Sequence, residues 1–295
     1  RSWSWTQPVI GRDCILPEMT GRSTDYDKLQ LEELNYNSYL KVPGLLDLQH
    51  RQTDPPHHDE MFFIIIHQSF ELWFKECLHE TDRLVFHLQN GSVSRALKIT
   101  KRLNAILETL TQQIQLLSTL TPAEFAGFRA SLGTGSGFQS VQFRELEFAF
   151  GLRDEWFMKF FADDPFAIQR LEKRLANPSV YEELLKALKD AGYDVPECRG
   201  EGLDEKVLEV FKHLYTHAEE NYHWVLLFEA MIDFDMLFSK WRSVHILMVS
   251  RTIGGQPGTG GSSGGGFLEG RLSHRFFPEL WEVRNRFWSP HKKKS

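Results

Sequence analysis

The chain has 295 residues, of which 41% are hydrophobic and 25% charged, the composition of a globular protein that buries a sizeable core. Its net charge is -6, and lysine and arginine are scattered among acidic residues, so no basic surface for nucleic acid or an anionic membrane is expected. Cys14, Cys77 and Cys198 lie far apart and form no C-x-x-C pair, which argues against a disulfide framework or a thiolate metal site and favours a reducing cytoplasm.

Hydrophobic residues recur with helical spacing almost throughout the chain. Alternation with a period of two is hard to find, so we expect an all-α protein. No stretch of about 18 apolar residues is free of charge, so no membrane segment is expected. We find no internal repeat, and one helical domain over residues 1–295 is the simplest description, with an irregular arm at 1–26 and a basic tail at 290–295.

The first expected elements are short. One or two helices are predicted over 29–49, with a break near Pro43 and Gly44. A proline-containing loop follows, from which Asp59 can cap the next helix. That helix is predicted to be long, from about 60 to 90, because the chain then reaches an Asn-Gly stop signal.

A second long helix is predicted over about 92–119, where isoleucine and leucine recur at helical spacing. The next helix has a clear start, with Thr121 as its cap, Pro122 at the first position and Glu124 completing a capping box. Residues 133–151 then read as a glycine-rich turn leading into a further helix.

Shorter helices are expected over 154–192, interrupted at 163–165 and at 177–178 by Asp-Pro and Asn-Pro sequences. Residues 205–254 are expected to be helical again. The stretch QPGTGGSSGGG, 256–266, is the richest in glycine, and too few residues follow it to form another domain. We therefore interpret it as a mobile functional loop rather than a linker.

Two histidines are predicted to face the core. His67 lies in the long helix 60–90, on a stripe that consists of Glu60, Phe63, His67, Phe70, Phe74 and Cys77. His245 shares a helix face with Trp241, Val244, Met248 and Thr252. Either histidine alone is best explained as a hydrogen-bonded core residue, because an unpaired buried imidazole is costly. Together, on distant helices of an aromatic-rich protein, they form the pattern that commonly holds a haem, with one imidazole on the iron and one on its open face.

A second metal hypothesis uses two Glu-x-x-His pairs, Glu76 with His79 and Glu220 with His223, a spacing found in di-iron helical bundles. The first pair falls on a charged helix face that reads as exposed to solvent. The further inward glutamates that such a site needs have no clear candidates. The HHDE sequence at 57–60 is likewise better explained as a loop and helix start than as a ligand cluster.

Several longer motifs resemble one known family. They are YNSYL, PPHHDEMFFIIIHQSFELWFKECLHE, GSGFQSVQFRELE, WRSVH and PGTGGSSGGGFL, and they occur in the order and approximate spacing seen in the tryptophan 2,3-dioxygenase family. The resemblance runs from about Tyr36 to Arg286. It implies a cytoplasmic, all-helical homotetramer, a dimer of dimers, in which haem b and O2 convert L-tryptophan to N-formylkynurenine by oxygen insertion across the indole C2–C3 bond.

The resemblance also implies roles for individual residues. His245 matches the proximal iron ligand, and His67 matches the distal base that meets the indole N–H. Arg129 matches the arginine that binds the substrate carboxylate, for which a planar guanidinium is well suited. Thr259 matches a loop threonine that contacts the ammonium and carboxylate groups. Without the resemblance, Arg129 would be assigned to an ion pair such as one with Glu124.

The remaining implied site residues form the walls of the pocket. Phe63 and Phe70 line the indole pocket, Ser136 lies near haem and substrate, and the residues that close the pocket, in this family partly from a neighbouring subunit, are Tyr36, Tyr39 and Leu40. On pattern alone, these phenylalanines would be ordinary core residues.

Five positions depart from the family pattern. Ile66 and Gln256 stand where polar and basic residues are usual, Phe70 where Ser or Tyr is common, Val244 where Arg precedes the proximal histidine, and Met248 where Thr is usual. These changes predict a more apolar pocket, and they leave open which indole is the substrate and which product is formed. One alternative is a related haem monooxygenase that inserts one oxygen atom into tryptophan or a methylated indole in natural-product biosynthesis. The other is a non-catalytic haem sensor.

Overall fold

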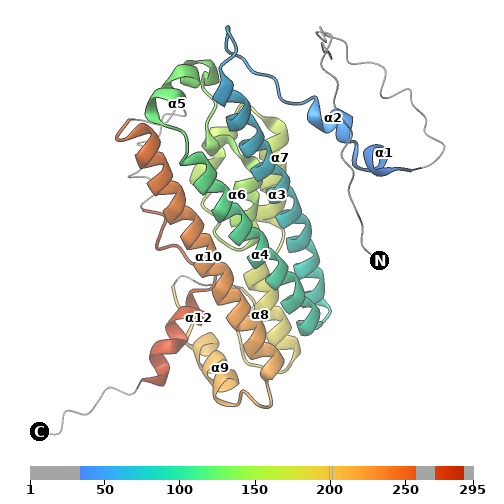
Figure 1. Ribbon diagram of the computed structural model, residues 1–295. Coiled ribbons are helices and arrows are strands. Elements are labelled where there is room, and N and C mark those ends of the chain that lie inside the picture. The colour runs from blue at the N-terminus through green and yellow to red at the C-terminus, as the bar shows by residue number, and fades with distance from the viewer. Residues whose placement is uncertain (1–33, 199, 201, 257–269, 289–295) are drawn as a thin grey trace, which may run out of the picture. The chain divides into compact units, whose positions relative to one another are not determined.

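The structure is a computed structural model, which describes residues 34–198, 200, 202–256 and 270–288 (Figure 1). All regular elements within these residues are helices and none is a strand, which confirms the expected all-α fold.

By its internal contacts the chain divides into a small unit, Arg1–His50, and a large unit, Arg51–Ser295. The single domain over the whole chain stays a prediction. The predicted arm at 1–26 and basic tail at 290–295 lie outside the described residues.

The small unit contains α1 (Tyr36–Leu40) and α2 (Val42–Leu46). Asn35 caps α1, and the side chain of Ser38 completes a capping box with it. The two helices meet at Lys41, which has a positive φ of 54°. Two short helices are thus found, as predicted, but the break lies at Lys41, two residues before the predicted position at Pro43. A proline fits the first turn of a helix, where its missing N–H has no intrahelical partner, and this one lies inside the start of α2.

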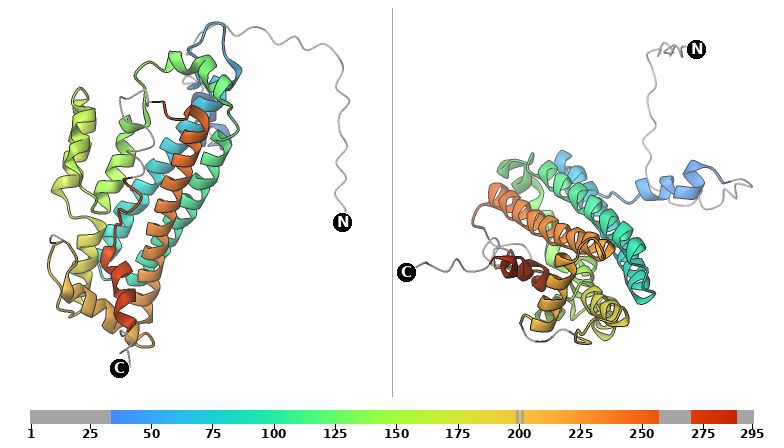
Figure 2. Two further views of the ribbon diagram at one scale, coloured as in Figure 1. Left: turned by 90° about the vertical axis from the view of Figure 1, so that its left-hand side faces the viewer. Right: turned by 90° about the horizontal axis from the view of Figure 1, so that it is seen from below.

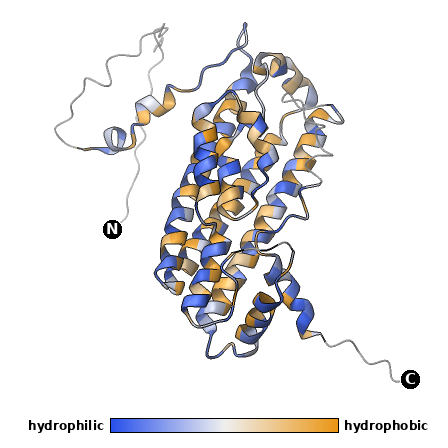
Figure 3. Cartoon of the chain, turned by 180° about the vertical axis from the view of Figure 1, so that it is seen from behind, coloured by the Kyte–Doolittle hydropathy of each residue, from blue (hydrophilic) through white to orange (hydrophobic). Residues whose placement is uncertain are grey.

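The frame of the large unit consists of three long helices, α3 (His58–Gln89), α4 (Val93–Leu117) and α10 (Tyr222–Ile253), and α4 packs against both others (Figures 1 and 2). Hydrophobic and hydrophilic residues share the surface of each long helix, as Figure 3 shows, because one face meets its neighbours and another meets solvent. The two predicted long helices at 60–90 and 92–119 are confirmed as α3 and α4. Within the described residues, no helix has both the length and the apolar character to cross a membrane.

Shorter elements surround this frame. In chain order they are α5 (Pro122–Arg129), η2 (Ala130–Leu132), η3 (Gly137–Gln139), α6 (Val141–Ala149), η4 (Glu155–Phe161), α7 (Pro165–Ala176), α8 (Val180–Asp190), α9 (Glu205–Thr216), α12 (Pro278–Glu282) and η5 (Val283–Phe287). The capping box predicted for α5 is confirmed: Glu124 N donates to Thr121 Oγ1 at 3.3 Å, and Thr121 N donates to Glu124 Oε2 at 2.8 Å. Both α6 and α8 pack against α3, so α6 forms a further wall beside the long helices.

Two predicted helix boundaries need correction. His57 rather than Asp59 caps α3, and its Nδ1 accepts a hydrogen bond from Asp59 N at 3.2 Å. Asp59 instead lies in the first turn, where its charge favours the helix dipole. The helical region predicted over 205–254 is broken at 217–221, between α9 and α10. Asn221 ends the break as the N-cap of α10.

Buried polar contacts fix α10 in this frame. The side-chain amide of Asn104, on α4, donates to the carbonyl oxygen of Ala230 on α10 at 2.9 Å. Asp235, which is 1% exposed, accepts from the backbone N–H of Phe276 at 2.8 Å, of Phe277 at 3.1 Å, and from the indole N–H of Trp281 at 3.1 Å. The C-terminal segment is thereby tied to α10, the helix that carries His245.

Candidate functional site

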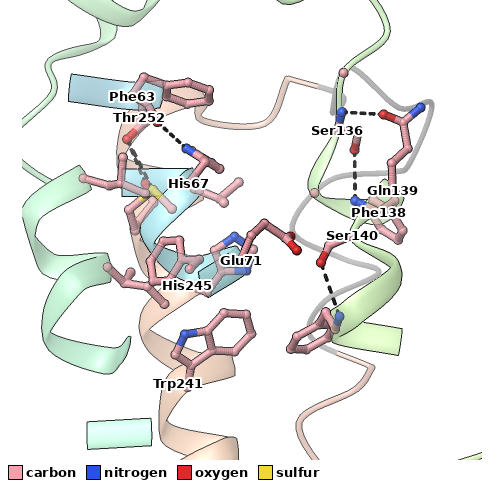
Figure 4. A pocket seen from close by; sticks show the side chains of 18 of the residues that line it. Phe63, His67, Glu71, Ser136, Phe138, Gln139, Ser140, Trp241, His245 and Thr252 are labelled. Atoms are coloured by element: carbon pink, nitrogen blue, oxygen red, sulfur yellow. Dashed lines mark hydrogen bonds between the residues drawn. The ribbon is translucent and has the colours of Figure 1, made fainter. Parts of the chain in front are cut away.

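A cavity of about 590 Å³ opens between the long helices, α5 and α6. Its walls are mainly aromatic and aliphatic. Figure 4 shows Phe63 and Thr252 at one end and Trp241 at the other, with His67, Glu71 and His245 between them. Six predicted site residues line this cavity: Phe63, His67, Phe70, Arg129, Ser136 and His245. Helices far apart in the sequence thus bring these residues to one cavity.

His67 lies on the α3 wall of the cavity, and its ring orientation is set by its own helix. Its Nδ1 lies 2.7 Å from the carbonyl oxygen of Phe63, one turn earlier. Because a carbonyl only accepts, Nδ1 must donate a proton there, which leaves Nε2 as an acceptor. Burial lowers the pKa of His67, although the Phe63 carbonyl and Glu71 oppose this. The imidazole is therefore neutral near pH 7 and can accept a hydrogen bond from a ligand.

His245 lies on the α10 wall of the same cavity. Burial, and then the charge of His67, lowers its pKa to about 4. Its imidazole is therefore neutral near pH 7, which is the form that binds iron. The ring of Trp241 stacks on it, with a centroid separation of 5.4 Å and an interplanar angle of 21°.

A charged cluster also lines the cavity, and it consists of Arg144, Glu147, Arg242 and Arg271. Glu147 Oε1 accepts from Arg242 Nη2 at 2.6 Å, and its Oε2 pairs with Arg144 and lies 3.7 Å from Arg271 Nη2. Burial raises the pKa of Glu147, but the three guanidinium groups outweigh it, so the pKa lies below its usual value. The carboxylate is thus ionised and holds three cations together.

We did not predict this cluster from the sequence. The i,i+3 spacing of Arg144 and Glu147 within QFRELE, and Arg242 within WRSVH, were available signals. Nothing in the helical pattern indicated that they meet, because Arg242 and Glu147 are 95 residues apart.

Arg129 and Ser136 also line the cavity. Arg129 is the last residue of α5 and is half-buried. Gly127 lets α5 approach the start of α3 closely, since a Cβ there would lie 2.6 Å from His57 Nε2. Ser136 caps η3, and its Oγ accepts from Phe138 N at 3.3 Å. The carboxylate of Glu124 is engaged in the capping box of α5, as described above.

Four predicted site residues are not placed at this cavity. Tyr36, Tyr39 and Leu40 belong to the small unit, where their side chains are 75%, 72% and 45% exposed. Thr259 and most of the predicted loop 256–266 lie outside the described residues. Their roles remain predictions.

Four of the five departures from the family pattern divide into two groups, and the fifth, Gln256, is exposed and does not line the cavity. Phe70 and Met248 line the cavity, and the Phe70 ring meets the His67 ring edge-on at a centroid separation of 6.2 Å. Ile66 is buried and Val244 is packed against the core, and neither lines the cavity. The apolar change at the site is therefore carried by Phe70 and Met248.

The alternative di-iron site finds no support in the geometry. His79 is exposed on α3, as the sequence indicated. Among residues 34–256 and 270–288, apart from the two masked positions 199 and 201, no group of three or more His, Cys, Asp and Glu side chains could hold a metal ion. A site with one protein ligand, such as His245, needs no such group.

Known proteins resemble the chain over most of its length. The family described as "Tryptophan 2,3-dioxygenase" matches residues 22–204 and 205–287. A tryptophan 2,3-dioxygenase of Arthrobacter sp. (strain FB24) is 42% identical over 258 residues, 85% of this chain and 91% of the relative. That of Xanthomonas euvesicatoria pv. vesicatoria is 40% identical over 258 residues, 85% and 87% of the two chains. That of Saccharopolyspora erythraea is 42% identical over 259 residues, 85% and 92%. The chain belongs to the tryptophan 2,3-dioxygenase family.

Proposed function

We propose that the protein is a haem-dependent dioxygenase that adds both atoms of O2 across the indole C2–C3 bond of L-tryptophan, giving N-formylkynurenine. One observation carries the proposal beyond family membership: two neutral imidazoles, His67 on α3 and His245 on α10, face one apolar cavity.

The residues of the cavity fit haem b. Its aromatic walls suit a flat apolar macrocycle, and His245 offers a neutral imidazole whose ring reaches the cavity. Haem bound there would supply a ferrous iron that binds and activates O2. The mainly apolar walls would disfavour water beside that chemistry.

The protein residues would position the substrate. His67 Nε2, left as an acceptor by the bond from Nδ1 to the Phe63 carbonyl, would accept the indole N–H. The rings of Phe63 and Phe70, which flank the His67 ring at 4.0 and 6.2 Å, would pack against the indole. Arg129, which also lines the cavity, would bind the carboxylate in two-pronged fashion. Thr259, by resemblance, would contact the ammonium and carboxylate groups.

The product tests this proposal directly. Reduced, haem-loaded protein is mixed with L-tryptophan and isotopically labelled O2, and the product is analysed by mass spectrometry. We expect a product that carries two labelled oxygen atoms. The absence of any oxygenated product from tryptophan, in protein that has taken up haem, would contradict the proposal.

A haem monooxygenase is the second candidate, and Phe70 and Met248 favour it. Both replace polar residues usual in the family, and both line the cavity beside the imidazoles. Polar side chains can direct the fate of the second oxygen atom through hydrogen bonds, and these two cannot do so in the same way. One labelled oxygen atom in the product, with dependence on an external reductant, would establish this alternative. A gas sensor is less favoured because it has no use for an arginine in the wall of the cavity.

Arg129 provides a more specific prediction. Replacing Arg129 with Ala removes a charged hydrogen-bonding partner of the carboxylate, an interaction of about 1.5–3 kcal/mol, so we expect tryptophan to bind about tenfold to a hundredfold more weakly. Binding is measured by absorbance titration of the haem-loaded protein.

Tryptamine, which lacks the carboxylate, is the matched control ligand and should bind both proteins equally. If the variant lost the same affinity for tryptamine as for tryptophan, Arg129 would not be the carboxylate partner. The absorption of the ligand-free protein should be unchanged.

We further propose a homotetramer in which the small unit of one subunit helps to close the pocket of another. The exposure of Tyr36, Tyr39 and Leu40 within the small unit supports this, because large apolar side chains gain stability when a partner covers them. Analytical ultracentrifugation should give the mass of four chains at micromolar concentration. A protein that is monomeric there and still fully active would contradict it.

A further inference from the structure

The orientation of the His245 ring is not set by a hydrogen bond within the described part of the chain. An iron-binding histidine usually donates its second ring N–H to a carboxylate, a carbonyl or water, which fixes the plane of the imidazole. No residue of 34–256 or 270–288 that the structure describes makes a hydrogen bond to either nitrogen of His245. The torsion that turns a histidine ring is broad, so a packing contact with the ring can decide its orientation.

Trp241 makes such a contact. It lies four residues before His245 on α10, a spacing that places the two side chains over each other. Their rings are nearly parallel, at 21°, with centroids 5.4 Å apart. When two flat rings are stacked, each can slide over the other, but neither can tilt away from the parallel arrangement without a clash.

Three phenylalanine rings, one each from α3, α6 and α10, pack against the indole ring of Trp241. Phe143, on α6, lies 5.1 Å from it at 31°, and Phe74, on α3, meets it edge-on at 6.4 Å. Phe238, one turn earlier on α10, lies 6.2 Å away at 50°. Rotation of the indole would drive it into one of these rings, so Trp241 is a rigid platform.

The indole N–H does not explain why a tryptophan stands here. Trp241 Nε1 is buried and has no hydrogen-bond partner among the described residues. The contacts that Trp241 does make, with His245 and with the surrounding phenylalanine rings, are all made by its indole ring. Figure 4 shows Trp241 next to His245, at the end of the cavity away from Phe63 and Thr252.

We propose that Trp241 is a positioning residue that fixes the plane of the His245 imidazole by stacking, and thereby the geometry and strength of its bond to a haem iron. This inference rests on the proposed function, because it needs haem on His245. It assigns the role to the flat ring and not to its N–H. A phenylalanine at position 241 should therefore still hold the His245 ring, whereas an unbranched side chain without a ring should not.

Three variants test the inference. Trp241→Phe keeps a flat ring over His245. Trp241→Met fills much of the same space without one. Phe234→Leu is the matched control, because it removes a buried ring from α10 that stacks on Phe150 at 4.2 Å and does not contact the rings of Trp241 and His245. Each protein is loaded with haem and reduced, and the iron–imidazole stretching band is recorded by resonance Raman spectroscopy. Haem dissociation to an apomyoglobin acceptor is measured in parallel.

We expect one narrow band at the same position in wild type, Trp241→Phe and Phe234→Leu. In Trp241→Met the band should be shifted or broadened, and haem should dissociate at least several-fold faster. An unchanged band and an unchanged dissociation rate in Trp241→Met would overturn the inference. A band change in Phe234→Leu as large as that in Trp241→Met would overturn it as well, because the effect would then be general loosening of the core.

A folding defect is recognised by loss of helical circular dichroism. If Trp241→Met shows one, Phe143→Leu replaces it: this variant keeps Trp241 and removes the ring 5.1 Å away that restrains it, so the band should broaden. No broadening in a folded Phe143→Leu protein would count against the inference. Failure of the wild type to bind haem is a separate result that rejects the proposed function itself.

Discussion

Replacing His245 with Ala should abolish stable haem binding. His245 is the imidazole of the α10 wall, and burial keeps it neutral and ready to bind a metal. The variant loses the proposed bond between protein and iron, while the apolar walls that pack around the macrocycle remain. Apoprotein is titrated with haem and the Soret absorption recorded; the wild type should saturate at one haem per chain and the variant should show only weak, unspecific uptake.

His67→Ala is the matched control, because it removes the other imidazole from the same cavity. It should still bind haem with a normal ferrous spectrum, and lose activity. Added imidazole should partly restore the absorption of His245→Ala by occupying the space that the side chain left. A wild-type spectrum in His245→Ala, with no added imidazole, would refute the assignment of the iron ligand.

Of the substitutions considered, Glu147→Gln should cause the largest decrease in the free energy of unfolding. Glu147 is 1% exposed and is the central partner of Arg144 and Arg242, with Arg271 nearby. A glutamine has nearly the same size but no charge, so it leaves buried guanidinium groups without their shared counter-charge. Breaking a buried ion pair in this way costs about 3–5 kcal/mol. Urea unfolding, followed by circular dichroism at pH 7, measures the difference from wild type.

The effect of Glu147 should also depend on pH. The pKa of its carboxyl is lowered in the folded protein below the usual 4.5, so folding favours the ionised form. The contribution of the Glu147 carboxylate to the free energy of unfolding is therefore complete above about pH 4.5. It is lost as the pH falls through the lower pKa of the folded state. The difference in free energy of unfolding between the wild type and Glu147→Gln should therefore decrease at acid pH. Asp194→Asn, which breaks an exposed pair with Lys206, should have no measurable effect at any pH. If Glu147→Gln lowered the free energy of unfolding at pH 7 no more than Asp194→Asn does, the charged cluster would contribute little to stability.

The sequence predicted the fold well where a local rule applies. Helical spacing over many turns gave α3 and α4 to within a few residues, and the Thr121 capping box fixed the start of α5. The break at 217–221 was missed because it contains neither proline nor glycine. The first turn of α3 was misassigned because His57, an unusual cap, accepts the bond that an aspartate would ordinarily accept.

Prediction of the site was limited by what periodicity can express. A helical stripe indicates that His67 and His245 face inward, but it does not say what lies opposite them. Only the packing of α3 against α4, and of α4 against α10, brings both to one cavity. The same limit applies to Glu147 and Arg242, because each looks like an ordinary charged residue on its own helix. The stack of Trp241 on His245 follows from their spacing, although its near-parallel angle depends on the rings packed around it.

The most direct test of the proposed site is an experimental structure of the protein loaded with haem and L-tryptophan without O2. We expect the iron to be bonded to a ring nitrogen of His245, and the indole N–H to be hydrogen-bonded to Nε2 of His67. A haem bound outside this cavity, or an iron bonded to any other residue of the chain, would contradict the account.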